Sequence, residues 1–245
     1  MNSSNWNEKN VVITGASKGL GAALADALSA RGATVVLIAR HEEPLDAVVQ
    51  ALRAKGRRAF GIPADVADKD ATHRISGLAA ALVGRVDVLI HNASTLGPVP
   101  LRALLDTECE DLAAVLETNV IGPFRLTKAL VGPMALRKAG TVVHVSSDAA
   151  VEGYASWGAY GASKAAADQL HRVLAAELKA AGVRVINVDP GEMDTDMHRD
   201  ALPDADPASL AQPSVVAERI IRVLEDEVRA PSGARVSASA FAEAA

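Results

Sequence analysis

The sequence predicts an α/β fold in which a doubly wound, parallel β-sheet of about seven strands is flanked by helices on both faces. Two observations support this prediction. Short apolar runs alternate with helical stretches along the chain, and the runs are nearly continuous in Val, Ile and Leu. Strands buried on both faces have such continuous runs. Alternating strands and helices build a parallel sheet between two helical layers.

The elements follow in chain order. The apolar runs predict strands over residues 11–14, 34–40, 58–66, 86–94, 141–147, 183–191 and 234–238. The intervening stretches predict helices over residues 19–31, 43–55, 68–83, 108–137, 156–181 and 213–229, where 108–137 is one long helix or two abutting ones. No linker rich in Pro, Gly or Ser and no break in composition divides the chain. We therefore expect one domain over residues 1–245, with a polar loop at about 192–212.

Composition excludes several functional classes. The net charge of −5 argues against a basic face for nucleic acid, and 3% aromatic residues are too few to stack single-stranded bases. Cys109 is the single cysteine and the six histidines lack metal-ligand spacing, so we expect neither a disulfide nor a metal site. No apolar stretch reaches the ~18 residues of a membrane span, and the N-terminus lacks a signal-peptide pattern. We expect a cytoplasmic protein.

Three glycines lie between the first predicted strand and the first predicted helix: Gly15, Gly19 and Gly21. Gly15 permits a tight turn, while Gly19 and Gly21 let backbone and helix approach a pyrophosphate. The N-terminus of the helix offers free N–H groups and a partial positive charge to the anion. Because this is the strand-turn-helix context that the motif requires, the segment predicts a dinucleotide site. A tight turn without a ligand is the alternative.

A second set of residues predicts proton-transfer chemistry. Tyr160 and Lys164 are four residues apart, which places them on one face of the predicted helix. A nearby ammonium favours the phenolate and lowers the tyrosine pKa from about 10, so the phenol can exchange a proton near neutral pH. The second tyrosine, Tyr154, has no such lysine. Ser147 ends the fifth apolar run, at the edge where parallel sheets bind ligands, and Asn119 is a polar residue in an apolar helical segment.

These motifs together resemble those of the short-chain dehydrogenase/reductase family, in its classical subfamily. The resemblance rests on the glycine spacing of TGASKGLG and on Asn119, Ser147, Tyr160 and Lys164 in that order, and it covers residues 9 to about 236. It implies a Rossmann-like fold, a catalytic tetrad of these four residues and a homodimer or homotetramer. It also implies that Tyr160 transfers the proton, that Lys164 holds the nicotinamide ribose and that Asn119 anchors a water.

The same resemblance implies the cofactor contacts. Basic residues at the positions of Lys18 and Arg40 accompany NADP(H) in the family, and the carboxylate that often follows the second strand in NAD binders is absent until Glu42. We therefore expect NADP(H) in preference to NAD(H), with two solvated surface cations as the alternative. The other implied cofactor residues are Gly15, Ser17, Gly19, Leu20, Gly21, Asp65, Val66, Asn92, Ala93, Tyr160, Lys164, Pro190, Gly191 and Thr195.

The sequence thus predicts an NADP(H)-dependent oxidoreductase that reversibly transfers a hydride between the nicotinamide and a small-molecule carbonyl or secondary alcohol, with Tyr160 as general acid/base. One alternative is a non-catalytic NADP(H)-binding sensor or scaffold of the same fold. Another is a sugar epimerase or dehydratase, which shares the Tyr-x-x-x-Lys spacing but usually has a different glycine loop. The substrate pocket is expected from residues 94–100, 148–157 and the substrate loop 192–212, whose acids are solvated or favour cationic or neutral substrates.

Overall fold

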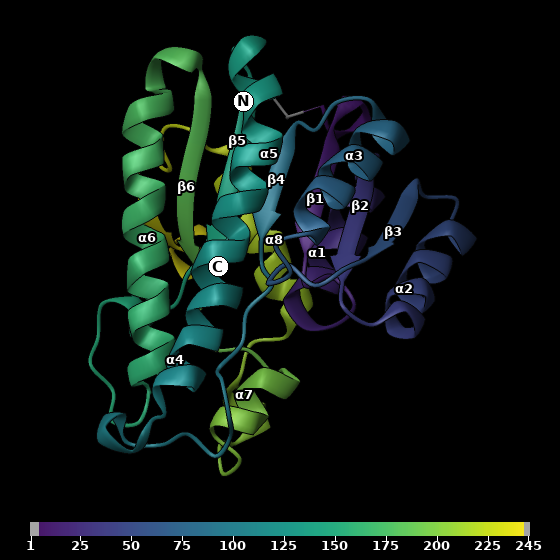
Figure 1. Ribbon diagram of the computed structural model, residues 1–245. Helices are drawn as coiled ribbons and strands as arrows, with labels where there is room; N and C mark the ends of the chain where they lie inside the picture. Colours follow the sequence, from purple (N-terminus) through teal and green to yellow (C-terminus); the bar gives the residue numbers. More distant parts are fainter. Residues whose placement is uncertain (1–4, 243–245) are drawn as a thin grey trace.

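The computed structural model describes residues 5–242, which contain one seven-stranded sheet (Figure 1). The strands are β1 (Asn10–Thr14), β2 (Thr34–Ala39), β3 (Ala59–Pro63), β4 (Val88–His91), β5 (Gly140–Val145), β6 (Val183–Asp189) and β7 (Arg235–Ser237). Their spatial order is β3-β2-β1-β4-β5-β6-β7, and every neighbouring pair is parallel. The predicted doubly wound parallel sheet is confirmed. Residues 1–4, part of the segment without a signal-peptide pattern, and 243–245 lie outside the described residues.

Helices cover both faces of this sheet. They are α1 (Gly19–Ala30), α2 (Glu42–Ala54), α3 (Ala71–Val83), α4 (Cys109–Leu116), α5 (Gly122–Leu136), α6 (Gly158–Leu178), α7 (Asp196–Ala201) and α8 (Pro213–Glu225). The buried side chains of α1, α2 and α8 belong to the core on one face, and those of α3, α5 and α6 to the core on the other. No helix in the part of the chain that the structure describes is long and apolar enough to cross a membrane.

The predicted helical region 108–137 is two helices joined by a π-helical segment, Glu117–Ile121. The break has a local cause in Pro123, which lies in the first turn of α5. Proline has no N–H to donate to the carbonyl of Asn119, four residues before it, so the regular α-helical ladder is interrupted there. The π-helical segment therefore surrounds one of the predicted catalytic residues.

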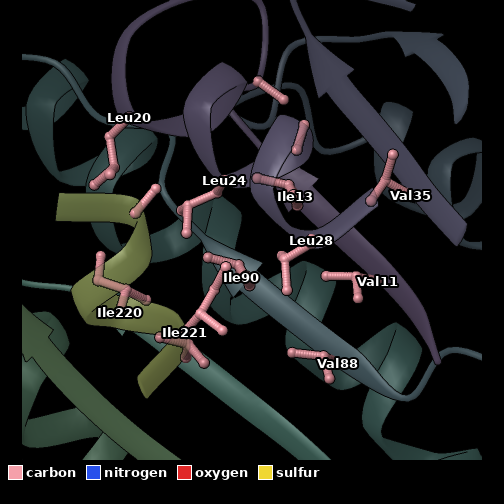
Figure 2. Packing of buried hydrophobic residues seen from close by; sticks show 14 of the residues in the cluster. Val11, Ile13, Leu20, Leu24, Leu28, Val35, Val88, Ile90, Ile220 and Ile221 are labelled. Atoms are coloured by element: carbon pink, nitrogen blue, oxygen red, sulfur yellow. The ribbon is translucent and has the colours of Figure 1, made fainter. Parts of the chain in front are cut away.

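The core under α1 and α8 fixes the start of α1 against the sheet (Figure 2). Leu24 and Leu28 of α1 face Ile220 and Ile221 of α8, and all four side chains are fully buried. Burying side chains of this size stabilises the fold by roughly 1.5–3 kcal/mol each. This packing holds the N-terminus of α1 beside the end of β1.

The strand order reverses between β1 and β4. From β1 the chain adds strands outward to β2 and β3, and from β4 it adds strands in the opposite direction. The loops after β1 and β4 consequently diverge and leave a crevice outside the carboxyl ends of the strands, where open α/β sheets bind their ligands.

Candidate active site

A cavity of about 640 Å³ lies at this edge, a size within the usual range for cofactor and ligand sites. It is lined by most of the predicted cofactor residues, namely Gly15, Ser17, Lys18, Gly19, Leu20, Arg40, Asp65, Val66, Asn92, Ala93, Tyr160, Lys164, Pro190 and Thr195. The predicted residues Gly21, Asn119, Ser147 and Gly191 are not part of this lining. No group of three or more His, Cys, Asp or Glu side chains within residues 5–242 is placed to hold a metal ion.

The glycine loop forms one wall as bare backbone. Gly15 and Gly19 have φ angles of +66° and +55°, which L side chains rarely adopt. A Cβ on Gly21 would lie 2.2 Å from the Gly15 carbonyl oxygen. Lys18 precedes α1 without a side-chain cap, so the first N–H groups of the helix remain available to an anion. This cradle fits a pyrophosphate.

Thr14 and Asn92 tie the ends of β1 and β4 together beneath the cradle. The Asn92 side chain donates to the carbonyl oxygens of Thr14 and Gly15, each at 3.0 Å. The Thr14 hydroxyl accepts from the backbone N–H groups of Asn92 and Ala93, each at 3.1 Å. Sequence reasoning missed Thr14, although a buried polar residue at the end of an apolar run is a signal for such a link.

Lys18 and Arg40 both line the cavity, but their surroundings differ. The Lys18 ammonium donates to Asp196 Oδ2 at 2.9 Å, across the cavity on α7. This hydrogen bond and a second from Arg199 lower the pKa of the Asp196 carboxyl. Arg40 is exposed and has no hydrogen bond or ion pair within the described residues. The expected cationic corner therefore exists, but one of its two cations already has a carboxylate partner.

Tyr160 and Lys164 lie one turn apart on α6 and are 8% and 2% exposed. The Lys164 ammonium donates to the Val145 carbonyl oxygen at 2.8 Å and lies 5.5 Å from the centre of the Tyr160 ring. Ser147 follows the end of β5, where its hydroxyl donates to Asp148 Oδ1 at 2.9 Å. The fold therefore brings the predicted proton-transfer residues to the cavity edge that the cradle also faces.

Asn119 lies behind these residues and is 1% exposed. Its amide nitrogen donates to the Thr95 carbonyl and to the Ser163 hydroxyl, each at 2.9 Å. Its side-chain oxygen accepts from the Thr95 N–H at 2.8 Å and from the Ser94 hydroxyl at 3.2 Å. These bonds use both donors and both acceptors of the amide, so the side chain of Asn119 fixes the segment after β4 to α6.

Burial is the largest cause of the pKa shifts of Tyr160 and Lys164. It raises the pKa of Tyr160 to about 12, although hydrogen bonds with Ser147 and Ser94 act to lower it. Burial lowers the pKa of Lys164 to about 8, and the charge of Asp168 acts in the opposite direction. The expected depression of the tyrosine pKa is therefore wrong for this arrangement. Lys164 lies over the ring and binds the Val145 carbonyl, so its charge does not outweigh the burial of the phenol.

Sequence reasoning also missed a row of polar residues across the sheet, which we call the polar row. It consists of His91, His144, Asn187 and Arg235, at matching register positions on β4, β5, β6 and β7. His171 of α6 stacks on His144 with the ring centres 4.8 Å apart. Burial lowers the pKa of His91 and His144 and brings that of His171 to about 4. Polar residues inside otherwise apolar runs were the available signal.

Arg235 connects the polar row to the active site. Its guanidinium donates to Asp168 Oδ2 at 3.0 Å, to the Ser147 carbonyl oxygen at 2.7 Å and to Asp189 Oδ2 at 3.2 Å. The Ser146 hydroxyl donates to the same Asp168 oxygen at 2.8 Å. Burial raises the pKa of Asp168, whereas Ser146 and Arg235 act to lower it. The last strand of the sheet thus holds the backbone of the predicted catalytic serine.

Comparison with known proteins agrees with this geometry. The family model of the short chain dehydrogenases matches residues 9–206. The chain belongs to this family. A short chain dehydrogenase of Pseudocercospora fijiensis is 38% identical in an alignment of 194 residues that covers 77% of this chain and 61% of that relative. The short-chain dehydrogenases are an oxidoreductase family, and the chain has their Rossmann-like sheet.

Solved structures share the whole architecture. A short chain dehydrogenase of Shigella flexneri, in complex with NADP, has a TM-score of 0.89 and 30% identity, covering 96% of this chain and 98% of its own. An NAD⁺-bound xylitol dehydrogenase has a TM-score of 0.85 with the same coverage of 96% and 98%, and at 24% identity it shows likeness of fold alone. This fold therefore occurs with either dinucleotide.

Proposed function

We propose that this short-chain dehydrogenase is an NADP(H)-dependent oxidoreductase that transfers a hydride reversibly between the nicotinamide and a small-molecule carbonyl or secondary alcohol. The observation that supports it most strongly is that Tyr160 and Lys164 line the same cavity as the glycine cradle. A phosphate-binding wall and a buried phenol with an ammonium beside it are the two parts that such a reaction needs.

In this proposal, side chains of the protein bind the substrate oxygen and exchange a proton with it. When bound, a nicotinamide supplies or accepts the hydride. In reduction, the Tyr160 hydroxyl donates its proton to the oxygen of the substrate. The Ser147 hydroxyl turns its proton from Asp148 to that oxygen and stabilises the alkoxide as it develops. The Lys164 ammonium stabilises the phenolate left on Tyr160 and holds the ribose hydroxyls of the cofactor.

Reprotonation of the site involves Asn119 through its backbone. The side chain of Asn119 has no donor or acceptor left for a water, because Thr95, Ser94 and Ser163 use all of them. The carbonyl of Asn119 receives no α-helical hydrogen bond, because Pro123 lacks an N–H. We therefore assign the expected water to this main-chain oxygen, from which it links Lys164 to solvent.

NADP(H) is the proposed cofactor because Arg40 and Lys18 offer cations to a 2′-phosphate at one end of the cavity. The NADP complex of the Shigella flexneri relative supports this choice. Arg40 is the stronger of the two cations, since Lys18 must leave Asp196 before it binds a phosphate. Asp65 and Val66 line the adenine end, and Pro190 and Thr195 the nicotinamide end, in this proposal.

The proposed partner is a small molecule, the proposed location is the cytoplasm, and the proposed assembly is a homodimer or homotetramer. Met193 and Met197 of the substrate loop and Tyr160 line the part of the cavity that remains for substrate. Ile121, beside α5, and Val173 on α6 are 38% and 44% exposed, and a second copy of the chain would cover them. Light scattering at working concentration measures the assembly, and a monomer would contradict it.

A substrate panel tests the proposed function. Purified protein is mixed with NADPH and varied ketones and aldehydes, and with NADP⁺ and varied secondary alcohols, while absorbance of the reduced nicotinamide is followed. Parallel reactions use NADH and NAD⁺. Substrate-dependent consumption or formation of NADPH supports an oxidoreductase. Tight NADPH binding without turnover of any compound on a broad panel favours the sensor or scaffold of the same fold.

A further inference from the structure

Two buried, oppositely charged residues lie one turn apart on α6. Lys164 and Asp168 are each 2% exposed, and their spacing places them on the same helix face. Lys164 donates to the carbonyl of Val145, and Asp168 accepts from the hydroxyl of Ser146, both at 2.8 Å. The two charges therefore bind consecutive residues at the end of β5, one turn of α6 apart.

Arg235 of β7 holds the carboxylate of Asp168. Its Nε donates to Asp168 Oδ2 at 3.0 Å, and its Nη2 donates to the Ser147 carbonyl oxygen at 2.7 Å. The second oxygen of Asp168, Oδ1, has no hydrogen bond within the described residues and lies 3.8 Å from Nε2 of His144. Oδ2 is thus fixed by two hydrogen bonds, and the negative charge of Asp168 is buried.

The other ionisable groups around Lys164 come from every element packed against it. Tyr160 and His171 on α6 and His144 on β5 interact with Lys164 directly. Beyond them, His91 on β4 acts on His144, Asp189 on β6 acts on Tyr160, and Arg235 on β7 pairs with Asp168 and Asp189. The three histidines are held neutral by burial, which lowers the pKa of each of them. Asp189 is engaged by Arg235. Asp168 is the carboxylate whose charge opposes the effect of burial on the pKa of Lys164.

We propose that Asp168 is a positioning residue of the active site: fixed by Ser146 and Arg235, it is the buried counter-ion that keeps the Lys164 ammonium charged and in place. A buried ammonium without a partner tends to lose its proton. A neutral lysine has no positive charge with which to stabilise a phenolate. The importance of this for catalysis rests on the proposed function, but the effect of Asp168 on the charge of Lys164 does not.

Direct titration of Lys164 in the full-length protein tests the proposal. Protein labelled with ¹³C at lysine Cε is followed by NMR between pH 6 and pH 11, and the Lys164 signal is assigned from its loss in Lys164→Arg. In Asp168→Asn the titration midpoint of Lys164 should fall by about one pH unit. In the control Ser146→Ala, which removes a hydrogen bond but keeps the charge, the midpoint should stay near that of the wild type. An unchanged midpoint in Asp168→Asn overturns the proposal.

A second variant keeps the test decisive if Asp168→Asn does not fold. Arg235→Gln leaves Asp168 with Lys164 as its nearest cation, so the midpoint of Lys164 should rise above the wild-type value. A midpoint at or below that value contradicts the counter-ion.

The alkaline limb of the pH profile, measured with any substrate found in the panel, should follow the NMR midpoint. Displaced midpoints without turnover of any compound would leave the counter-ion standing and remove the proposed function. Turnover with an unmoved midpoint in Asp168→Asn would do the reverse.

Discussion

The two ends of the cavity are built in different ways. At the cofactor end, bare backbone of the glycine loop and two exposed cations, Lys18 and Arg40, face the space. At the catalytic end the side chains of Tyr160 and Lys164 are buried, and nearby Arg235 of β7 donates hydrogen bonds to Asp168 of α6 and to the Ser147 carbonyl after β5. The cofactor end depends on local chain geometry, whereas the catalytic end depends on contacts between distant segments.

This difference predicts which kind of substitution disturbs each end of the cavity most. Backbone groups in a tight turn are fixed once the turn forms, so one side chain added in the wrong place blocks the site. Buried polar side chains are fixed by their partners, so the loss of one charge disturbs its neighbours. We therefore expect single side-chain deletions to matter most at the catalytic end and single side-chain additions to matter most at the cofactor end.

The largest effect is expected at the phenol. Tyr160→Phe removes the proposed acid and base while keeping the ring that packs on Trp157, so kcat should fall by about 10³-fold. The dissociation constant of NADPH, measured by fluorescence titration, should stay close to that of the wild type. Tyr154→Phe is the matched control, because Tyr154 is 47% exposed, and it should retain turnover. Near-normal turnover by Tyr160→Phe would remove this residue from the mechanism.

An added methyl group at Gly21 should disrupt the cofactor end. The new Cβ would lie 2.2 Å from the Gly15 carbonyl oxygen and 2.7 Å from the Asn92 amide nitrogen, so the cradle must shift. We expect Gly21→Ala to lose about 2 kcal/mol of stability and most of its NADPH affinity. Gly132→Ala on α5 is the control, because nothing lies within 4 Å of its Cβ, and it should be neutral or stabilising. Equal behaviour of the two variants in denaturant melts and NADPH titration would contradict the cradle.

The buried histidines predict loss of stability in mild acid. Burial brings the pKa of His171 to about 4, so the unfolded chain binds this proton first as the pH falls below about 6.5. Stability is therefore complete above that pH and declines toward pH 4, by about 2 kcal/mol at pH 5 from His171 alone. His91 and His144 shift in the same direction. Thermal melts at pH 7 and pH 5 measure the loss, which should be smaller in His171→Leu; an equal loss would show that other groups cause it.

Cofactor choice should respond less, because both cations are exposed. Arg40→Ala removes a charge-assisted contact to the proposed 2′-phosphate, so the preference for NADPH over NADH should fall about tenfold. The ratio of the two dissociation constants measures it, with Arg53→Ala, whose guanidinium binds the Ala59 carbonyl away from the cavity, as control. An unaltered ratio would contradict a phosphate contact at Arg40.

The smallest effect should have the opposite sign. Asp196→Asn weakens the competition for Lys18, and an exposed ion pair of this kind contributes less than about 1 kcal/mol. The preference for NADPH should therefore rise by less than about fivefold. Asp194→Asn is the matched control, because Asp194 pairs with Arg199 and not with Lys18. A rise in both variants would point to the general charge of the loop instead of the Lys18 pair.

Local patterns made much of this molecule predictable. Apolar runs predicted all seven strands, and the inner strands are buried on both faces, whereas the edge strands β3 and β7 are only partly buried. The glycine spacing predicted the cradle, and the four-residue spacing of Tyr160 and Lys164 predicted their shared helix face. Each of these signals lies within one or two adjacent elements, where the chain itself fixes the geometry.

The unpredicted part consists of contacts between distant residues. Arg235 and Asp168 are separated by 67 positions, and Lys18 and Asp196 by 178. Nothing in the sequence near either partner specifies the other, because the packing of the whole sheet brings them together. Burial reversed one expectation in the same way: it raises the pKa of Tyr160 although a lysine lies one turn away. The π-helical segment at Asn119 was likewise missed, although Pro123 was visible.

The place of Arg235 on β7 has a consequence for truncated forms of the chain. Of the described residues around the active site, Arg235 comes last in the chain. The glycine cradle, Tyr160 and Lys164 precede it, but the backbone of Ser147 gains its guanidinium partner only when β7 pairs with β6. A chain truncated before β7 would keep the residues of the glycine cradle, but the backbone of Ser147 would lack its guanidinium partner.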